Sequence, residues 1–257
     1  MITAGIDIGV EHIKVIILKD RQIAGRAKGS SGGADRGGMV EQAYQAALRD
    51  AGATRADVVK IAATGKGKHN AAIADVLISE QVAAAKAARF LYPGATCVVS
   101  AGADEIMAAV LGEKNRINEY TFNQKCAAGL GLFLESMARR LGMSLEDMSR
   151  LGAPKEAAVN EGCVVMAELD ALSLLNHGVS REEVGGAVIS AAAVRAASVI
   201  HDITKPAKDC VVLVGGLARN AAFVRALKAI SGIEFLIPGE AEYAGALGAA
   251  LPVAETA

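Results

Sequence analysis

Short apolar runs that end at glycine alternate along the chain with segments of helical periodicity. The apolar runs, with the turns that close them, predict strands at residues 3–8, 13–18, 60–63, 97–104 and 210–214. The periodic segments predict helices at residues 40–51, 220–230 and 243–251. Because strands and helices alternate in this way, the chain is predicted to have an α/β fold.

The first two strands predict a β-hairpin with Asp7, Gly9 and Lys14 at its tip. A carboxylate in an otherwise apolar strand needs a polar partner. At a hairpin lined by phosphate groups, Asp7 could hold Mg²⁺ through water; the alternative is an aspartate that only stabilises the turn. The lysines of a later turn, Lys66 and Lys68, could face a nucleotide or a partner, and an exposed basic turn is the alternative.

Two Pro-Gly pairs, at residues 93–94 and 238–239, are the clearest breaks in the pattern. They predict a first lobe of residues 1–94 and a second lobe of residues 95–238. The C-terminal helix, within residues 239–257, is expected to pack back on the first lobe.

Composition narrows the class of protein. The chain has 257 residues, of which 52% are hydrophobic, so it can bury a large core. Its formal net charge is -1 and its charged residues are interspersed, which argues against binding to nucleic acid or an anionic membrane. No basic segment precedes an apolar stretch at the start, and no apolar run approaches the roughly 18 residues of a membrane span. A cytoplasmic protein is therefore expected.

The four cysteines have no short paired spacing, which argues against a disulfide framework. Cys97 and Cys210 lie inside apolar strands and are expected to be core residues. Cys126 and Cys163 each come just before a segment with helical spacing. A helix N-terminus favours the thiolate and places N–H donors near sulfur, so these two are candidate metal ligands. Ordinary core residues are the alternative.

The segments after these two cysteines have apolar residues at helical spacing. Those after Cys126 are Leu130, Phe133, Leu134, Met137, Ala138 and Leu141. Those after Cys163 are Val165, Leu169 and Leu172, whereas Glu168 and Asp170 are assigned to a solvated face. An iron–sulfur cluster usually needs four thiolates, so two copies of this pattern, related by a twofold axis, would complete such a site.

Three apolar strands end at glycine-containing turns, near Gly9, Gly102 and Gly215. Glycine permits positive φ and close approach, so successive backbone N–H groups can form a concavity for phosphate. The sequence contains neither a Walker A motif nor a GxGxxG dinucleotide turn. Ordinary strand endings are the alternative for each turn.

Several segments together resemble a known family. They are GIDIGVEHIK (5–14), TGKGK (64–68), NQKCAAGLGLFLE (123–135), EGCVVMAELDALSLLNHG (161–178), VGGLARN (214–220) and YAGALGAAL (243–251). In this order they are similar to the motifs of the ATPase activators of 2-hydroxyacyl-CoA dehydratases and of the related ATPase subunits of benzoyl-CoA reductase. The resemblance spans nearly the whole chain. It implies the actin/hexokinase/Hsp70-like (ribonuclease H-like) ATPase fold, with two lobes around a nucleotide cleft.

The resemblance also implies a cofactor and partners. Two subunits of that family share one [4Fe–4S] cluster, so Cys126 and Cys163 become the cluster ligands of this chain. Binding and hydrolysis of ATP, with Mg²⁺, change the angle between the helices at the cluster. An electron then leaves at very low potential for a catalytic acyl-CoA reductase or dehydratase. A ferredoxin-like protein is the implied donor, and the second ATPase subunit is a paralogue or another copy.

The nucleotide contacts that the resemblance implies come from the glycine turns and their neighbours. They are Asp7, Gly9, Lys14, Gly102, Glu105, Gly129, Gly131, Gly215, Gly216 and Asn220, and no catalytic residue is assigned.

The chain departs from the family pattern at positions that the resemblance places near the nucleotide phosphates, here called the phosphate side. Val10 stands where a hydroxyl residue is usual, residues 100–105 are SAGADE in place of Asp-Ile-Gly-Gly-Gln-Asp, and Leu130 stands where CAAGTG has threonine. Because such groups position metal or water at the γ-phosphate, their loss predicts weak hydrolysis by this chain alone. We therefore expect a less regular subunit of a heteromer, similar to the smaller, D-type subunit of benzoyl-CoA reductase.

Other functions stay open at this point. Within the same family, the alternative is a homodimeric activator of a 2-hydroxyacyl-CoA dehydratase. Outside the family, the chain could be a cluster-free relative of sugar or acetate kinases, or a non-catalytic scaffold with a nucleotide-binding fold.

Overall fold

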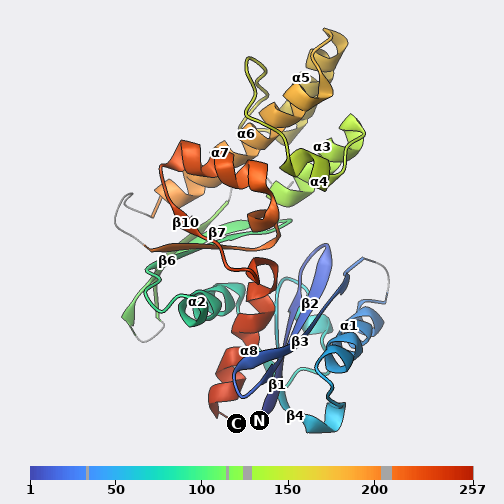
Figure 1. The fold of residues 1–257 in the computed structure, drawn as a ribbon, viewed down its shortest axis with the longest axis vertical. Helices are drawn as coiled ribbons and strands as arrows, with labels where there is room; N and C mark the ends of the chain where they lie inside the picture. Colours follow the sequence, from blue (N-terminus) through green and yellow to red (C-terminus); the bar gives the residue numbers. More distant parts are fainter. Residues whose placement is uncertain (33–34, 114–115, 124–128, 204–209, 257) are drawn as a thin grey trace. The chain divides into compact units, whose positions relative to one another are not determined.

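The computed structural model describes residues 1–32, 35–113, 116–123, 129–203 and 210–256 (Figure 1). The chain forms two compact units. The first consists of Met1–Gly94, Glu113–Ile117 and Glu242–Ala257, and the second of Ala95–Gly112 and Asn118–Ala241. Cys126, the first candidate cluster ligand, lies outside the described residues.

The first unit is built on a five-stranded mixed sheet with the strand order β3-β2-β1-β4-β5. Its strands are β1 (Ile2–Ile8), β2 (His12–Lys19), β3 (Gln22–Ser30), β4 (Val58–Thr64) and β5 (Val76–Leu77). Strand β1 pairs antiparallel with β2, in a register that puts Asp7 opposite Lys14, and parallel with β4. The predicted hairpin is confirmed.

Helices cover both faces of this sheet: α1 (Arg36–Asp50), α2 (Glu80–Leu91) and α8 (Ala244–Thr256) (Figure 1). Side chains alternate between the faces of a strand. Ile6 and Ile8 of β1 therefore join the core that α1 completes, whereas Gly5 and Asp7 face α8. Helix α8 packs against β1 and α2, so the C-terminal segment completes the first unit.

The second unit has its own five-stranded sheet, with the order β10-β9-β6-β7-β8. The strands are β6 (Cys97–Ala101), β7 (Ile106–Leu111), β8 (Ile117–Phe122), β9 (Val211–Val214) and β10 (Phe235–Leu236). Strand β6 pairs antiparallel with β7 and parallel with β9. Because β6 and β9 run in the same direction, the turns that follow them lie at the same edge of the sheet.

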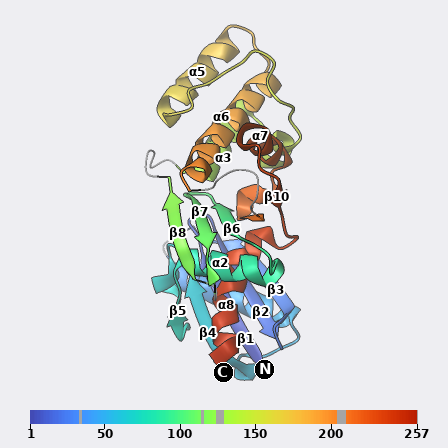
Figure 2. The same cartoon turned by 90° about the vertical axis from the view of Figure 1, so that its left-hand side faces the viewer.

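Among its described residues, the second unit has the α-helices α3 (Leu130–Leu141), α4 (Leu145–Ser149), α5 (Val164–Asn176), α6 (Arg181–His201) and α7 (Ala221–Ser231). The apolar face predicted for α3 is confirmed, because all six of its expected residues are buried. Figures 1 and 2 show α5 beside the outer part of α6, at the end of this unit that is farthest from its sheet.

Helix α6 is at the centre of this core. Of the described helices, it alone has the length and the mean hydropathy, 1.5, of a membrane span. Its apolar residues are interrupted by Arg195, and 72% of its most apolar window is buried inside the unit, as in a core helix.

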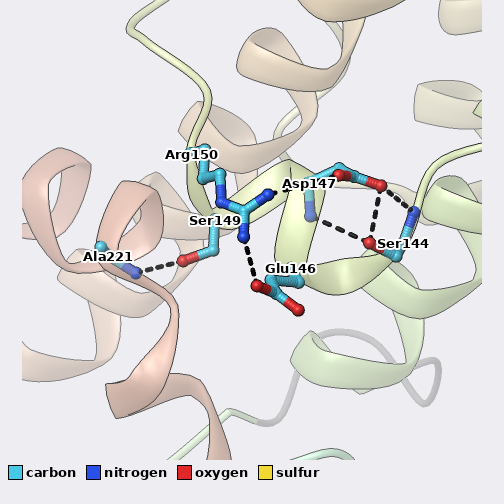
Figure 3. Close-up of polar contacts among 6 residues, drawn as sticks. All are labelled: Ser144, Glu146, Asp147, Ser149, Arg150 and Ala221. Atoms are coloured by element: carbon cyan, nitrogen blue, oxygen red, sulfur yellow. Dashed lines mark hydrogen bonds and ion pairs between the residues drawn. The ribbon is translucent and has the colours of Figure 1, made fainter.

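Polar contacts within the α4 segment, and one between α4 and α7, are drawn in Figure 3. Ser144 and Asp147 form a reciprocal capping box at the start of α4. Ser149 Oγ accepts a hydrogen bond from the N–H of Ala221 at 2.9 Å, at the first turn of α7. Since helix N-termini leave N–H groups without internal partners, this contact stabilises the start of α7.

Candidate functional site

The hairpin tip of the first unit brings three predicted residues together. Asp7 Oδ2 lies 3.7 Å from Lys14 Nζ, and the two side chains are 18% and 16% exposed. Gly9 follows at the turn, where its N–H donates to the carbonyl of His12 at 3.0 Å. The tip therefore holds a paired carboxylate and ammonium that solvent reaches only partly, next to a backbone turn.

Two glycines that were not assigned to the site enclose the Asp7 carboxylate. A Cβ at Gly65 would lie 2.6 Å from Asp7 Oδ1, and a Cβ at Gly245 would lie 2.7 Å from Asp7 Oδ2. Gly65 also has φ of 91°, a conformation that favours glycine. Both residues lie in segments of the family resemblance, but only the fold shows that those segments meet at Asp7.

The turn after β4 is tied to the hairpin by its backbone. The N–H of Gly67 donates to the carbonyl of Ile8 at 2.9 Å. Lys66 Nζ lies 3.6 Å from a carboxylate oxygen of Glu80, at the start of α2. Lys66 is thus engaged in an ion pair within its own unit.

In the second unit, several predicted residues surround the end of β6. The turn from β6 to β7 is closed by the N–H of Gly102, which donates to the carbonyl of Glu105 at 2.9 Å. The N-terminus of α3 meets this turn, because the N–H groups of Gly131 and Leu132 donate to the carbonyls of Gly102 and Ala103. These N–H groups are therefore used inside the protein.

Glycine is required for this close approach. A Cβ at Gly129 would lie 2.5 Å from the carbonyl oxygen of Ala103, and one at Gly131 would lie 2.8 Å from Ala103 Cα. Gly129 and Gly215 also have φ of 53° and 95°. A side chain at Gly215 would collide with the backbone of Ala101, at the end of β6. The fold thus gives these glycines a packing role, while contact with a nucleotide stays a prediction.

The last two predicted contacts lie after β9. Gly216 is exposed, and its Cβ position is open. Asn220 is buried and caps α7, because its Oδ1 accepts a hydrogen bond from the N–H of Phe223 at 2.9 Å. The asparagine of VGGLARN therefore has a structural role of its own.

Cys163 is an exposed free thiol at the N-cap position of α5. Its N–H donates to Asn160 Oδ1 at 2.7 Å, which fixes the backbone at the sulfur-bearing residue. Cys97, in contrast, is buried in β6 as expected, and Cys210 is partly buried. Within the described ranges, no three His, Cys, Asp or Glu side chains converge as a metal site would require.

Helix α5 presents an apolar face to solvent directly after Cys163. The exposed fractions are 65% for Val165, 54% for Leu169 and 43% for Leu172. The helix is confirmed, but these residues do not pack inward; Val164, Ala167 and Ala171 do. An apolar surface of this kind marks an interaction site.

The acidic residues of α5 were expected on a solvated face, and this expectation is wrong. Glu168 accepts hydrogen bonds from Arg140 at 3.0 Å and from Ser136 at 3.3 Å, both on α3. Asp170 accepts one from the N–H of Asn160 at 2.9 Å. The helices after the two candidate ligands are therefore connected directly, and α5 also holds the loop before Cys163.

The chain belongs to the BadF/BadG/BcrA/BcrD ATPase family, whose sequence profile matches residues 4–253. It is 35% identical to the activator of lactoyl-CoA dehydratase of Anaerotignum propionicum, over 100% of this chain and 99% of that protein. It is 30% identical to the D-type subunit of benzoyl-CoA reductase of Thauera aromatica, over 97% of this chain and 92% of that protein.

Solved structures agree with this family and show the fold. The activator of the 2-hydroxyisocaproyl-CoA dehydratase from Clostridium difficile, with bound ADPNP, matches 100% of this chain and 95% of its own with a TM-score of 0.91 at 30% identity. A ROK family glucokinase from Streptomyces griseus matches 100% of both chains with a TM-score of 0.65 at 14% identity, which shows the fold alone. The expected actin/hexokinase-like ATPase fold is confirmed.

Proposed function

We propose that this chain is the ATP-dependent electron-transfer component of a CoA-ester dehydratase or reductase system, and that two ATPase subunits share one [4Fe–4S] cluster through Cys126 and Cys163. The observation that carries this proposal is the start of α5. There the exposed thiol of Cys163, whose backbone N–H is bound by Asn160, precedes an exposed apolar face of the helix. A ligand and a surface for a second subunit therefore lie on one helix.

The chemistry of Cys163 fits a cluster. Thiolates are the ligands that iron–sulfur clusters use, and a helix N-terminus stabilises a thiolate. A bound cluster supplies one-electron transfer at low potential. The chain contributes the exposed sulfur and a fixed backbone at Cys163, and Cys126 is the second ligand in this proposal.

For the nucleotide, we propose ATP or ADP with Mg²⁺. Asp7 and Lys14 form the polar group on the first unit, where the carboxylate suits Mg²⁺ held through water and the ammonium suits phosphate. On the second unit, the proposed nucleotide contacts lie around the ends of β6 and β9, at Gly102, Glu105, Gly129, Gly131, Gly215, Gly216 and Asn220. The ADPNP bound to the Clostridium difficile activator supports this choice of ligand.

As the catalytic partner, we propose a 2-hydroxyacyl-CoA dehydratase, with the activator acting as a homodimer. The 35% identity to the lactoyl-CoA dehydratase activator over nearly both full lengths supports this partner. A ferredoxin-like protein is the proposed electron donor, and the cytoplasm is the proposed location.

A benzoyl-CoA reductase is the second candidate, and this chain would then pair with a paralogous ATPase subunit. Its support is the altered phosphate side at Val10, Ser100 and Leu130, together with 30% identity to the D-type subunit of Thauera aromatica. In the structure Leu130 is buried in the core of the second unit at the first turn of α3. An apolar residue at this position is consistent with packing there.

The first test is iron binding by cysteine variants after anaerobic reconstitution. Cys126→Ser and Cys163→Ser are expected to lose the iron–sulfur absorption and EPR signals. Cys97→Ala and Cys210→Ala are the matched controls and should retain them. Equal loss in all four variants would overturn the ligand assignment.

The second test identifies the partner. The reduced protein with ATP is added to a 2-hydroxyacyl-CoA dehydratase that lacks its activator, and dehydration is followed. Turnover supports the dehydratase. No turnover there, with activity restored in a benzoyl-CoA reductase that lacks its D-type component, would favour the second candidate.

A further inference from the structure

The loop before Cys163 is held by side chains from neighbouring helices. Residues 150–163 connect α4 to α5 without a helix or strand of their own. Near the start, Arg225 Nη2 of α7 donates to the carbonyl of Leu151 at 2.8 Å. In the middle, Glu183 of α6 accepts the N–H groups of residues 155–157.

At the end of this loop, Arg195 of α6 binds the backbone next to Cys163. Its Nη2 donates to the carbonyl of Asn160 at 3.0 Å, and its Nε donates to the carbonyl of Glu161. The side chain of Asn160 in turn accepts the N–H groups of Gly162 and Cys163 at 2.9 and 2.7 Å. Arg195 therefore fixes the residue that orients the backbone of Cys163.

The same guanidinium contacts the helix that follows Cys126. Arg195 Cζ lies 4.6 Å from the ring centroid of Phe133, a cation–π contact, and Phe133 is buried in α3. One side chain thus touches both the loop that carries Cys163 and the helix that follows Cys126 in the sequence. A planar guanidinium can donate at its edge while its face lies on a ring, which a lysine ammonium cannot reproduce.

We infer that Arg195 is a positioning residue that holds the Cys163 segment in a fixed place relative to α3, and so sets the orientation of Cys163 as a cluster ligand. The inference rests on the proposed function, because it takes Cys163 as a ligand. It assigns to Arg195 no contact with the cluster itself.

The test uses full-length protein with Arg195→Met, Arg195→Lys and the matched control Arg225→Met, which removes an arginine–carbonyl contact at the other end of the same loop. Hydrogen exchange is measured by mass spectrometry in the iron-free protein. Arg195→Met is expected to speed exchange at residues 160–163 by about tenfold, because the N–H of Cys163 loses its fixed acceptor. The exchange rate in Arg195→Lys should lie between those of wild type and Arg195→Met. Arg225→Met should change the exchange rate at residues 160–163 by less than about twofold.

The same variants are then reconstituted with iron and sulfide. For Arg195→Met we expect an altered EPR spectrum, partly restored in Arg195→Lys and unchanged in Arg225→Met. If Arg195→Met leaves both exchange at 160–163 and the EPR spectrum unchanged, or if Arg225→Met gives the same effects, the inference is wrong. Wild-type protein that takes up no iron would instead overturn the proposed function, and Arg195 would then only anchor a loop.

Discussion

At the residue scale, the position of the Asp7 carboxylate depends on two neighbouring glycines, which leave room for it. Gly65 and Gly245 come from different parts of the sequence, yet an added methyl group at either would lie within 2.7 Å of a carboxylate oxygen. The carboxylate can keep its position near Lys14 only if both positions stay glycine. This enclosure explains why the turn after β4 and the start of α8 both matter to the site.

Replacing Gly245 by alanine is predicted to weaken binding of Mg²⁺ and ADP by about tenfold, or ~1.4 kcal/mol, because the Asp7 carboxylate must move. Isothermal titration calorimetry measures the change. Gly239→Ala is the matched control, since a Cβ there meets nothing within 4 Å. Equal affinities in Gly245→Ala and wild type would show that the carboxylate takes no part in nucleotide binding.

At the element scale, the loop between α4 and α5 relies on charged side chains rather than on a core of its own. Glu183 at the start of α6 accepts backbone hydrogen bonds from Glu156, Ala157 and Lys155, and these lower the pKa of its carboxyl below the ordinary 4.5. A carboxyl with a lowered pKa stabilises the folded state fully above its unfolded value. That contribution is lost as the pH falls through the folded value.

Glu183→Gln is therefore predicted to lower stability at neutral pH, and the difference from wild type should shrink as the pH falls below about 4.5. Urea unfolding at several pH values between 7 and 3 gives the midpoint of wild type and of Glu183→Gln at each pH. Glu146→Gln, on the exposed surface of α4, serves as a control for removal of a carboxylate. A loss of stability in Glu183→Gln that is as large at pH 3 as at pH 7 would contradict the account.

Hydrophobic periodicity predicted the helices and strands that have one apolar and one polar face. It was less successful for elements without such a contrast. The hairpin of β1 and β2 and helix α3 follow the sequence closely, because their apolar residues share one face. The helix α5 was also expected, but periodicity alone does not reveal that its apolar face is exposed. The strand β8 was missed, since most of its residues are exposed and its pattern is weakly apolar.

The same limit applies to the candidate site. Asp7, Gly9 and Lys14 were found because they are close in sequence and share a turn. Gly245 is far from Asp7 in sequence, and Arg195 is 32 positions beyond Cys163, so their roles depend on tertiary contacts. Glu168 and Asp170 were misassigned for this reason, because their partners lie on α3 and in the preceding loop.

At the scale of the whole molecule, membership of an ATPase family predicts ATP hydrolysis. The altered residues on the phosphate side predict that this hydrolysis is weak. The purified chain alone is predicted to bind nucleotide but to hydrolyse ATP slowly, because Ser100 stands where the family resemblance implies a carboxylate that would help position metal or water. Ser100→Asp should raise the steady-state rate of phosphate release. Robust hydrolysis by the wild-type homodimer would contradict this prediction and show that the altered residues do not limit hydrolysis.

The central claim is that one cluster joins two ATPase subunits, and native mass spectrometry of the anaerobically reconstituted chain tests it most directly. The account predicts a species with two chains and about four irons, and no stable iron on a single chain. Chelation should remove the iron and the mass that goes with it. Full iron loading of a verified monomer, or a dimer that takes up no iron under these conditions, would contradict the account.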